Sequence, residues 1–358
     1  MKIIDKYILK KFLGSFIFTV LIIVSIILVI DITEKTEKFA KAELSTAEVI
    51  GYYMDFVPWI ANFITPLTVF IATVFVTARM AGHTEIIAIL SSGVSFRRML
   101  LPYFIGSMLI AITSFYLTGW VIPDSNKSRV AFEIEYLKSK YYFDKTNYHI
   151  QVAPNTYLYM RSYNNQSDMG YDFTLERVEG TRLLEKLSAS RIKWDEEKQK
   201  WSLTNWKWHS IAGDVERIDE GKEMDTTLAI HPSEFDNDYR SYDAMTINEL
   251  DEQIAKLRLR GASNVEVFEV EKYVRFTSPF AVLILTFMGV IVSARKTRGG
   301  AGFQIALGFL LSFIYILLFI MTKTIAEAGG GIDPAISVWF PNILFGGISL
   351  IMYKYVPR

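Results

Sequence analysis

Histidine has the widest chemical use of any side chain, and this sequence carries four of them. His83, His149, His209 and His231 are scattered, without the H-x-x-x-H or H-x-H spacing that places two imidazoles on one metal ion. Cysteine is absent, which excludes disulfides, thiol nucleophiles and cysteine-ligated zinc or iron–sulfur sites. We therefore expect neither a metal site nor a cofactor.

Motifs of nucleotide chemistry and hydrolysis are also missing. No G-x-x-x-x-G-K-[ST] loop occurs, and glycine-rich residues 299–302 are followed by no Lys-Ser or Lys-Thr, which favours a tight turn. Glu196 and Glu197 lie in a predicted hairpin turn, where solvation accounts for two adjacent acids. No nucleophile elbow is present. The sequence disfavours an enzyme and predicts no catalytic residue.

One carboxylate, Glu85, leads a short apolar segment in the loop of residues 79–98. Thr84 can cap a helix of about residues 84–92, and Gly93 can end it. Ile86, Ile87, Ile89 and Leu90 give this helix an apolar side. Such a helix suits a socket on a soluble motor domain, but a helix lying on the membrane interface fits the pattern equally well.

A membrane-embedded body must position these residues. Six apolar stretches reach the roughly 20 residues of a helical crossing, namely residues 12–30, 56–76, 100–122, 276–294, 303–324 and 336–353. Their polar residues Ser25, Thr65, Thr68, Ser312 and Thr322 are expected to bond back to their own helices. No unpaired charge lies in the middle of a stretch, which argues against an ion-coupled carrier because proton relays need such a group.

Charge predicts the orientation. Lys+Arg and Asp+Glu balance at 38 each, which gives no pull toward nucleic acid. Short loops rich in Lys and Arg stay in the cytoplasm. Such loops fall on one side of a six-span scheme, with basic residues Lys2, Lys6, Lys10, Lys11, Arg79, Arg97, Arg98, Arg295, Lys296, Arg298, Lys354 and Arg358. Both termini are predicted cytoplasmic and the central domain outside.

The chain divides into spans in residues 1–122, a polar domain in 123–272 and spans in 273–358. Period-two alternation predicts strands at residues 156–161, 172–177, 182–194, 201–211 and 224–230, the third and fourth forming a long hairpin. An antiparallel sandwich or open roll follows. Its Leu, Ile, Tyr and Trp form either an ordinary core or a groove for acyl chains, and both alternatives stay open.

A helical connector is expected in residues 246–272. Residues 246–260 carry early acids and late bases, which suits the helix dipole, and Gly261 is a plausible stop. Asn264 can cap a second helix that continues into the fourth span.

Several segments, in order along the chain, resemble the LptF/LptG (YjgP/YjgQ) family of lipopolysaccharide export ABC transporter permeases. Residues 85–95, Glu-Ile-Ile-Ala-Ile-Leu-Ser-Ser-Gly-Val-Ser, are similar to the family's coupling helix. Further matches are Asp5-Lys-Tyr-Ile8, Trp120-Val-Ile-Pro123, the hairpin of residues 182–201, Ser278-Pro-Phe280, Pro334 and Pro341. The resemblance implies six transmembrane helices (3+3) with an inserted antiparallel β-jellyroll-like periplasmic domain, and the compact length resembles the LptG member.

The resemblance also implies function and partners. Such a permease extracts lipopolysaccharide from the outer leaflet of the inner membrane and passes it to a periplasmic bridge protein (LptC/LptA-like). It pairs with a paralogous LptF-like permease and is driven by two copies of an LptB-like cytoplasmic ATPase. Lys35, Lys38 and Lys41 would be the candidates for binding lipid phosphates, although solvated juxtamembrane lysines are equally typical of such positions.

By position, Glu85 with Ile86, Ala88 and Gly93 would couple to the ATPase. Asp31 stands where a family lysine is expected, which is a departure from the pattern. A competing hypothesis is a membrane-anchored periplasmic scaffold without transport activity. It predicts no motor-docking loop, so co-purification of an ATPase separates the two.

Overall fold

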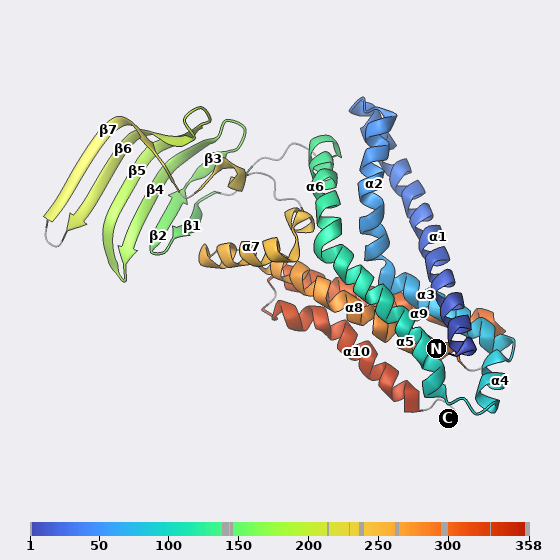
Figure 1. Ribbon diagram of the computed structural model, residues 1–358. Coiled ribbons are helices and arrows are strands. Elements are labelled where there is room, and N and C mark those ends of the chain that lie inside the picture. Colours follow the sequence, from blue (N-terminus) through green and yellow to red (C-terminus); the bar gives the residue numbers. More distant parts are fainter. Residues whose placement is uncertain are drawn as a thin grey trace. The chain divides into compact units, whose positions relative to one another are not determined.

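The computed structural model describes residues 2–137, 143, 146–212, 215–228, 230–235, 240–261, 265–294, 300–329 and 331–354 (Figure 1). Two compact units share the chain. The helical unit contains Met1–Leu137, Arg240–Asp251 and Glu266–Arg358, and the β unit contains Lys138–Tyr239 and Glu252–Val265. Asn264, residues 295–299 and Arg358, which entered the sequence predictions, lie outside the described residues.

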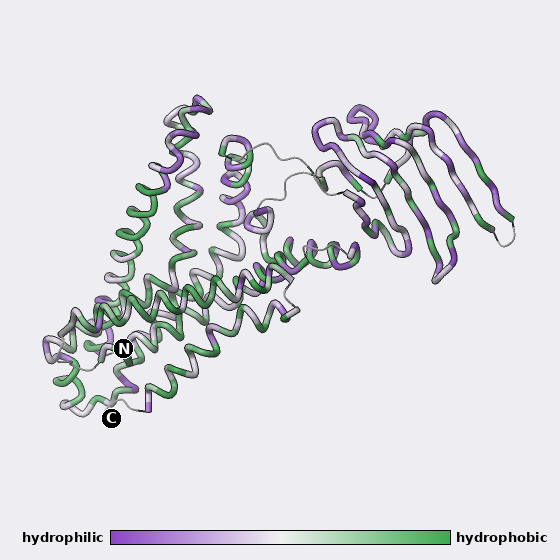
Figure 2. Tube along the Cα trace, turned by 180° about the vertical axis from the view of Figure 1, so that it is seen from behind, coloured by the Kyte–Doolittle hydropathy of each residue, from purple (hydrophilic) through white to green (hydrophobic). Residues whose placement is uncertain are grey.

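Helices form nearly all of the helical unit. In chain order its elements are α1 (Ile3–Lys41), α2 (Thr46–Phe63), α3 (Thr65–Gly82), α4 (Glu85–Ser91), α5 (Phe96–Tyr116), η1 (Leu117–Val121), α6 (Ile122–Phe132), η2 (Glu133–Leu137), η4 (Ser241–Ala244), α7 (Ile247–Leu259), which continues into the β unit, α8 (Val265–Ser293), α9 (Gly300–Glu327) and α10 (Pro334–Lys354). Hydrophobic residues dominate the long helices (Figure 2).

Six helices of the described chain are long and apolar enough to cross a membrane: Ile3–Lys41, Thr65–Gly82, Phe96–Leu137, Val265–Ser293, Gly302–Glu327 and Pro334–Lys354. The fold class predicted from the sequence, six apolar helices with an antiparallel β insert, is confirmed. The helix Thr65–Gly82 is the most enclosed of the six within this chain, and Ile3–Lys41 is the least.

The second apolar stretch, residues 56–76, is not one helix as the hydropathy suggests. α2 ends at Phe63, Ile64 lies between the helices, and α3 starts at Thr65 with Pro66 in its first turn. A proline ring clashes with the carbonyl four residues earlier and supplies no N–H, so Pro66 favours a new helix start. The span is therefore α3 alone, and α2 is a separate helix that begins at a Ser45–Glu48 capping box.

The third stretch also differs in length. Helix continues from α5 through η1 and α6 to Leu137, beyond Ile122 where the apolar run ends. Hydropathy marks where polarity changes, whereas the helix continues through residues 123–137 with opposite charges paired within it, as Lys127 with Asp124 and Arg129 with Glu133. The compact units accordingly divide at Leu137 rather than at the hydropathy boundary of residue 123.

The described strands of the β unit form one antiparallel sheet in the order β1-β2-β4-β5-β6-β7, with β3 paired to β4. The strands are β1 (Tyr148–Ala153), β2 (Thr156–Met160), β3 (Ser162–Asn164), β4 (Met169–Glu179), β5 (Arg182–Asp195), β6 (Lys200–Ala212) and β7 (Val215–Thr226). The predicted hairpin is confirmed, and Trp194 is directly opposite Trp201 across it.

The predicted strand at residues 224–230 has the wrong limits, because of its described residues only 224–226 belong to a strand, the end of β7. β7 instead starts at Val215, opposite Ala212, and ends at Thr226 opposite Trp201, because the partner strand β6 sets its length. Ile230 contributes a backbone carbonyl that accepts a 2.8 Å hydrogen bond from the Trp201 indole. Ile230 and Phe235, the last residue of η3 (Pro232–Phe235), are part of the sheet's buried core with Leu158, Phe173 and Leu203.

The predicted helix at residues 246–260 is confirmed as α7. Thr246 and Glu249 bond reciprocally: the Thr246 N–H donates to the Glu249 carboxylate at 2.7 Å, and the Glu249 N–H donates to the Thr246 hydroxyl at 3.3 Å. These bonds hold the pKa of the Glu249 carboxyl below its usual range. Gly261 has φ +63°, which glycine adopts readily, and it follows the helix end as expected.

Candidate functional site

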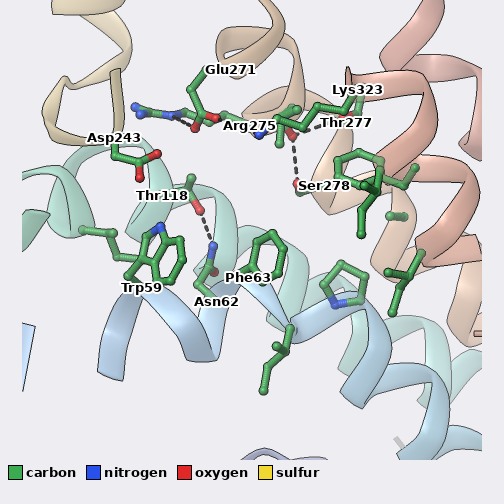
Figure 3. A pocket seen from close by; sticks show the side chains of 18 of the residues that line it. Trp59, Asn62, Phe63, Thr118, Asp243, Glu271, Arg275, Thr277, Ser278 and Lys323 are labelled. Carbon is green, nitrogen blue, oxygen red and sulfur yellow. Dashed lines mark hydrogen bonds and ion pairs between the residues drawn. The ribbon is translucent and has the colours of Figure 1, made fainter. Parts of the chain in front are cut away.

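A cavity of about 400 Å³ lies inside the helical unit, at the end of the helices that carries η4 (Figure 3). We call this the η4 pocket. Its lining comes from α2, α3, η1, α6, η4 with Arg240, α8 and α9. Figure 3 shows Trp59 and Phe63 on one wall and the charged side chains of Glu271, Arg275 and Lys323 on the facing wall. The pocket therefore joins an apolar surface to a charged one.

Arg275 connects α8 to the η4 segment. Its side chain is almost fully buried, and its Nε donates to Glu271 at 3.1 Å. The two remaining guanidinium nitrogens donate to the backbone carbonyls of Tyr242 at 2.8 Å and Met245 at 2.6 Å. Lys323 of α9 reaches Glu271 at 3.7 Å, which adds a third element to the group. Arginine suits this position because its planar fork donates in several directions at once.

Arg129 of α6 is completely buried and ion-paired with two carboxylates. Nη1 lies 2.8 Å from Glu133 and Nη2 lies 3.1 Å from Asp243 of η4. Nε donates to Asn126 at 2.9 Å, and the guanidinium lies 4.4 Å from the Trp59 ring centroid. A buried charge is tolerated only when paired and hydrogen-bonded. Arg129 meets that condition with partners from three elements.

The Arg129 pairs extend into a continuous polar series toward α1. The Tyr52 hydroxyl of α2 donates to Glu133 at 3.1 Å and accepts from Lys35 of α1 at 2.7 Å. Lys35 also lies 2.8 Å from Asp31. We call the residues Asp31, Lys35, Tyr52, Glu133, Arg129 and Asp243 the buried series. It joins α1, α2, α6, η2 and η4 by charged or charge-assisted contacts.

Asp243 is the carboxylic acid of the series that lies outside the six candidate spans. Burial, together with the nearby Glu271 carboxylate, raises the pKa of its carboxyl to about 6. The guanidiniums of Arg240 and Arg129 act in the opposite direction but do not outweigh the loss of hydration. The Asp243 carboxyl therefore changes between its protonated and ionised forms at about pH 6, well above the range of an ordinary aspartate.

The three lysines proposed for lipid phosphates do not converge. Lys35 is occupied by Asp31 and Tyr52, and Lys38 donates to the backbone carbonyl of Leu137 at 3.1 Å. Lys41 pairs with Glu37 at 2.7 Å, and 75% of its side chain is exposed. Asp31, the departure from the family pattern, accepts from Lys35 and from the Tyr53 hydroxyl at 2.8 Å. None of these residues lines the η4 pocket.

The predicted short helix in the second loop is present as α4, Glu85–Ser91, but Thr84 does not cap it. Thr84 has φ +59° and its hydroxyl donates to the His83 carbonyl, so it is a left-handed turn residue. A capping residue normally has extended backbone, and this conformation turns the hydroxyl away from the first helical N–H groups. Gly93 follows the helix with φ +85° and ends it as expected.

The faces of α4 are clearly divided. Ile86 is buried in the core of the helical unit, whereas Ile87 is 53% exposed and Ala88 is exposed. Glu85 points toward α1: its carboxylate accepts from Lys11 at 3.2 and 3.3 Å and from the Tyr7 hydroxyl at 3.0 Å. Glu85 keeps a 30% exposed side chain in that arrangement.

Sequence reasoning missed Arg129, Asp243, Glu271, Arg275 and Lys323. A signal was present for four of them, because Arg129–Glu133, Glu271–Arg275 and Lys323–Glu327 are opposite charges four residues apart at the ends of apolar stretches. Asp243 had no such signal, since it contacts Arg129 across 114 residues of chain. Among the described residues, no cluster of three or more His, Asp or Glu could hold a metal ion.

Comparison with known proteins gives one match to a family. No significant match was found among curated proteins. The family model described as lipopolysaccharide export system permease LptF/LptG matches residues 6–355. This range includes all of the described strands, five of the six candidate spans and all but the first three residues of the other. The chain belongs to the LptF/LptG family of lipopolysaccharide export permeases and is a multi-pass inner-membrane protein.

Proposed function

We propose that this permease subunit moves lipopolysaccharide with energy from a separate cytoplasmic ATPase that docks on α4. The observation that carries the proposal is the exposed apolar face of α4, where Ile87 is 53% exposed beside the exposed Ala88. An exposed apolar surface rimmed by polar groups marks a contact with a protein or a membrane. Ile86 anchors the helix in the core, Gly93 ends it, and Glu85 supplies the charge for docking.

The proposal includes partners and orientation. Two LptB-like ATPases, an LptF-like permease and an LptC/LptA-like bridge complete the exporter, and lipopolysaccharide enters from the outer leaflet of the inner membrane. The β unit is periplasmic and both termini are cytoplasmic. Support comes from the ion pairs Asp5–Arg98 at 2.6 Å and Lys11–Glu85 at 3.2 Å, which hold the N-terminal end of α1 against α4 and α5. Arg79, Arg97 and Arg98 enrich the same end in positive charge.

The η4 pocket is proposed to contact the lipid during passage. Trp59 and Phe63 offer apolar surface for acyl chains. The cationic groups Arg275 and Lys323 are balanced by Glu271 and Glu327. This wall would therefore bind polar groups of the lipid that form hydrogen bonds, and it carries no excess positive charge to attract phosphates.

Replacement of Glu85 by alanine tests the docking proposal. We expect Glu85→Ala to reduce co-purification of the ATPase from mild detergent, because a charge-assisted contact at the interface is lost and the charge on the motor is left unpaired. Proteins would be identified by mass spectrometry and ATP-driven lipid release measured alongside. Glu252→Ala, an exposed acid on α7, is the control and should behave as wild type. Unchanged assembly and transport in Glu85→Ala would remove Glu85 from the mechanism, and absence of any ATPase with the wild-type chain would favour a scaffold.

Lys35, Lys38 and Lys41 remain the proposed contacts for lipid phosphates, and the exposed Lys41 is the best placed to reach them. A photo-crosslinking residue at position 41 is expected to capture lipopolysaccharide in native membranes more strongly than one at position 35, which is enclosed by Asp31 and Tyr52. Lys10, exposed at the other end of α1, is the matched control and should capture none. If crosslinkers at positions 35, 38 and 41 capture no lipopolysaccharide while crosslinkers elsewhere in the chain do, the assignment of these lysines as phosphate contacts is wrong.

A further inference from the structure

Three side chains join α1 to α4, and we call Tyr7, Lys11 and Glu85 the α1–α4 clasp. The Lys11 ammonium donates to both Glu85 oxygens, at 3.2 and 3.3 Å, and the Tyr7 hydroxyl donates to one of them at 3.0 Å. Tyr7 and Lys11 are four residues apart on one helix face, and the ammonium lies 4.2 Å from the Tyr7 ring centroid. Each member is thus oriented by the other two.

The clasp leaves Glu85 able to bind a further partner. An ionised carboxylate offers about four acceptor sites, and the clasp uses three of them. The Glu85 side chain also keeps 30% of its surface exposed. A cation from a docked protein can therefore reach Glu85 while Lys11 and Tyr7 still hold it.

Packing beneath the clasp makes α1 and α4 move together. Ile8 and Phe12 of α1 and Ile86 of α4 belong to one buried cluster and are at most 2% exposed. Close packing of this kind transmits displacement, because interiors have low compressibility. Asp5, one turn before the cluster, is buried and pairs with Arg98 at 2.6 Å, which fixes the start of α1 to α5 as well.

α1 is suited to carry such a displacement to its far end. It is one uninterrupted helix of 39 residues, about 58 Å long at the usual rise per residue. Only 6% of the residues in its most apolar segment are buried within the chain, so the middle of the helix is held by few contacts, whereas its two ends are anchored. Asp31 and Lys35, at its far end, start the buried series that reaches Asp243.

We propose that Lys11, oriented by Tyr7, is a positioning residue that transfers motion of α4 to α1 and so couples ATP hydrolysis in the motor to lipid movement. This inference rests on the proposed docking of an ATPase on α4. It assigns to Lys11 transmission of the movement and leaves docking itself to Glu85 and the exposed face of α4.

Lys11→Met tests the transfer, because methionine keeps an unbranched chain and removes the charge. We expect Lys11→Met to retain ATPase co-purification and ATP hydrolysis, while lipid released per ATP falls at least about fivefold, the lower end of ordinary coupling between sites. Lys11→Arg keeps the ion pair with Glu85 and should release as much lipid per ATP hydrolysed as the wild type. Lys10→Met is the matched control, since Lys10 is the exposed neighbour and makes no ion pair among the described residues.

The readouts separate the possible failures. Wild-type lipid release per ATP in Lys11→Met would overturn the transfer while leaving docking intact. Loss of ATPase binding equal to that of Glu85→Ala would also overturn it, because Lys11 would then belong to the docking surface. No ATPase with the wild-type chain would instead defeat the proposed function. Tyr7→Phe removes one hydroxyl from an exposed side chain and is the second variant in case Lys11→Met fails to fold. Lipid released per ATP should fall in Tyr7→Phe, but less than in Lys11→Met.

Discussion

Arg129→Met is expected to lower the free energy of unfolding of the helical unit by about 3–5 kcal/mol, the usual cost of removing one partner from a buried ion pair. Arg129 is fully buried, and its removal leaves Glu133 and Asp243 facing each other without a cation between them. The Asn126 amide oxygen loses a donor as well. Thermal unfolding of the purified chain in one detergent, followed by circular dichroism, measures the loss.

Lys127→Met is the control for Arg129→Met, because Lys127 lies on the same helix with a half-exposed side chain. Its ion pairs with Asp124 and Glu249 are at the surface, where a pair contributes about 0–1 kcal/mol. A triple variant, Arg129→Met with Glu133→Gln and Asp243→Asn, should recover part of the lost stability, since no buried carboxylate is left unpaired. Equal stability losses in Arg129→Met and Lys127→Met would show that the buried series does not hold the helices together.

Acid is expected to stabilise the wild-type chain relative to Asp243→Asn. Burial raises the folded-state pKa of Asp243 to about 6, whereas the unfolded carboxyl titrates near 3.8. Between these values the folded state binds more protons than the unfolded state, so this group's contribution to stability increases as pH falls and decreases as pH rises through about 6. A shift of this size corresponds to about 2–3 kcal/mol.

Melting temperatures of wild type and Asp243→Asn between pH 7.5 and about pH 3 provide the measurement, because the unfolded carboxyls of Asp243 and Glu249 titrate near 3.8 and 4.5. The difference should move in favour of wild type as the pH falls from about 6 toward 3.8, the interval between the folded-state and unfolded-state pKa values of Asp243. Glu249 supplies a control of opposite sign, because its pKa is lowered and Glu249→Gln should lose its disadvantage in acid. A pH-independent difference for Asp243→Asn would mean that Arg240, Arg129 and Lys323 keep Asp243 ionised.

Local patterns predicted the elements whose partners lie nearby in the sequence. Alternation gave the hairpin with Trp194 opposite Trp201, because only a few turn residues separate its strands. Ser25 and Ser312 donate to carbonyls of their own helices at 2.8 and 3.0 Å, as expected, whereas Thr65 of α3 donates to the Ala61 carbonyl of α2 at 2.9 Å. Helix α7 was predicted from its charge order and its stop at Gly261. All of these interactions close within one element or one turn.

Features that depend on distant partners escaped sequence reasoning. β7 takes its limits from β6, so alternation within residues 224–230 could not fix them. Glu85 is oriented by Lys11 across 74 residues, and nothing in the loop itself indicates that contact. The proline at position 66 was visible, but hydropathy alone could not decide whether it would bend the second stretch or divide it.

Arg129 has a consequence for how the chain accommodates its insertion. The guanidinium holds Glu133, just before the chain leaves the helical unit at Leu137, and Asp243, just after the chain returns at Arg240. The first exit and return are thereby fastened to one side chain at the two ends of residues 138–239, while a second segment of the β unit, Glu252–Val265, follows later in the chain. Residues 138–239 can therefore change in sequence or length without changing how the helices of the helical unit pack.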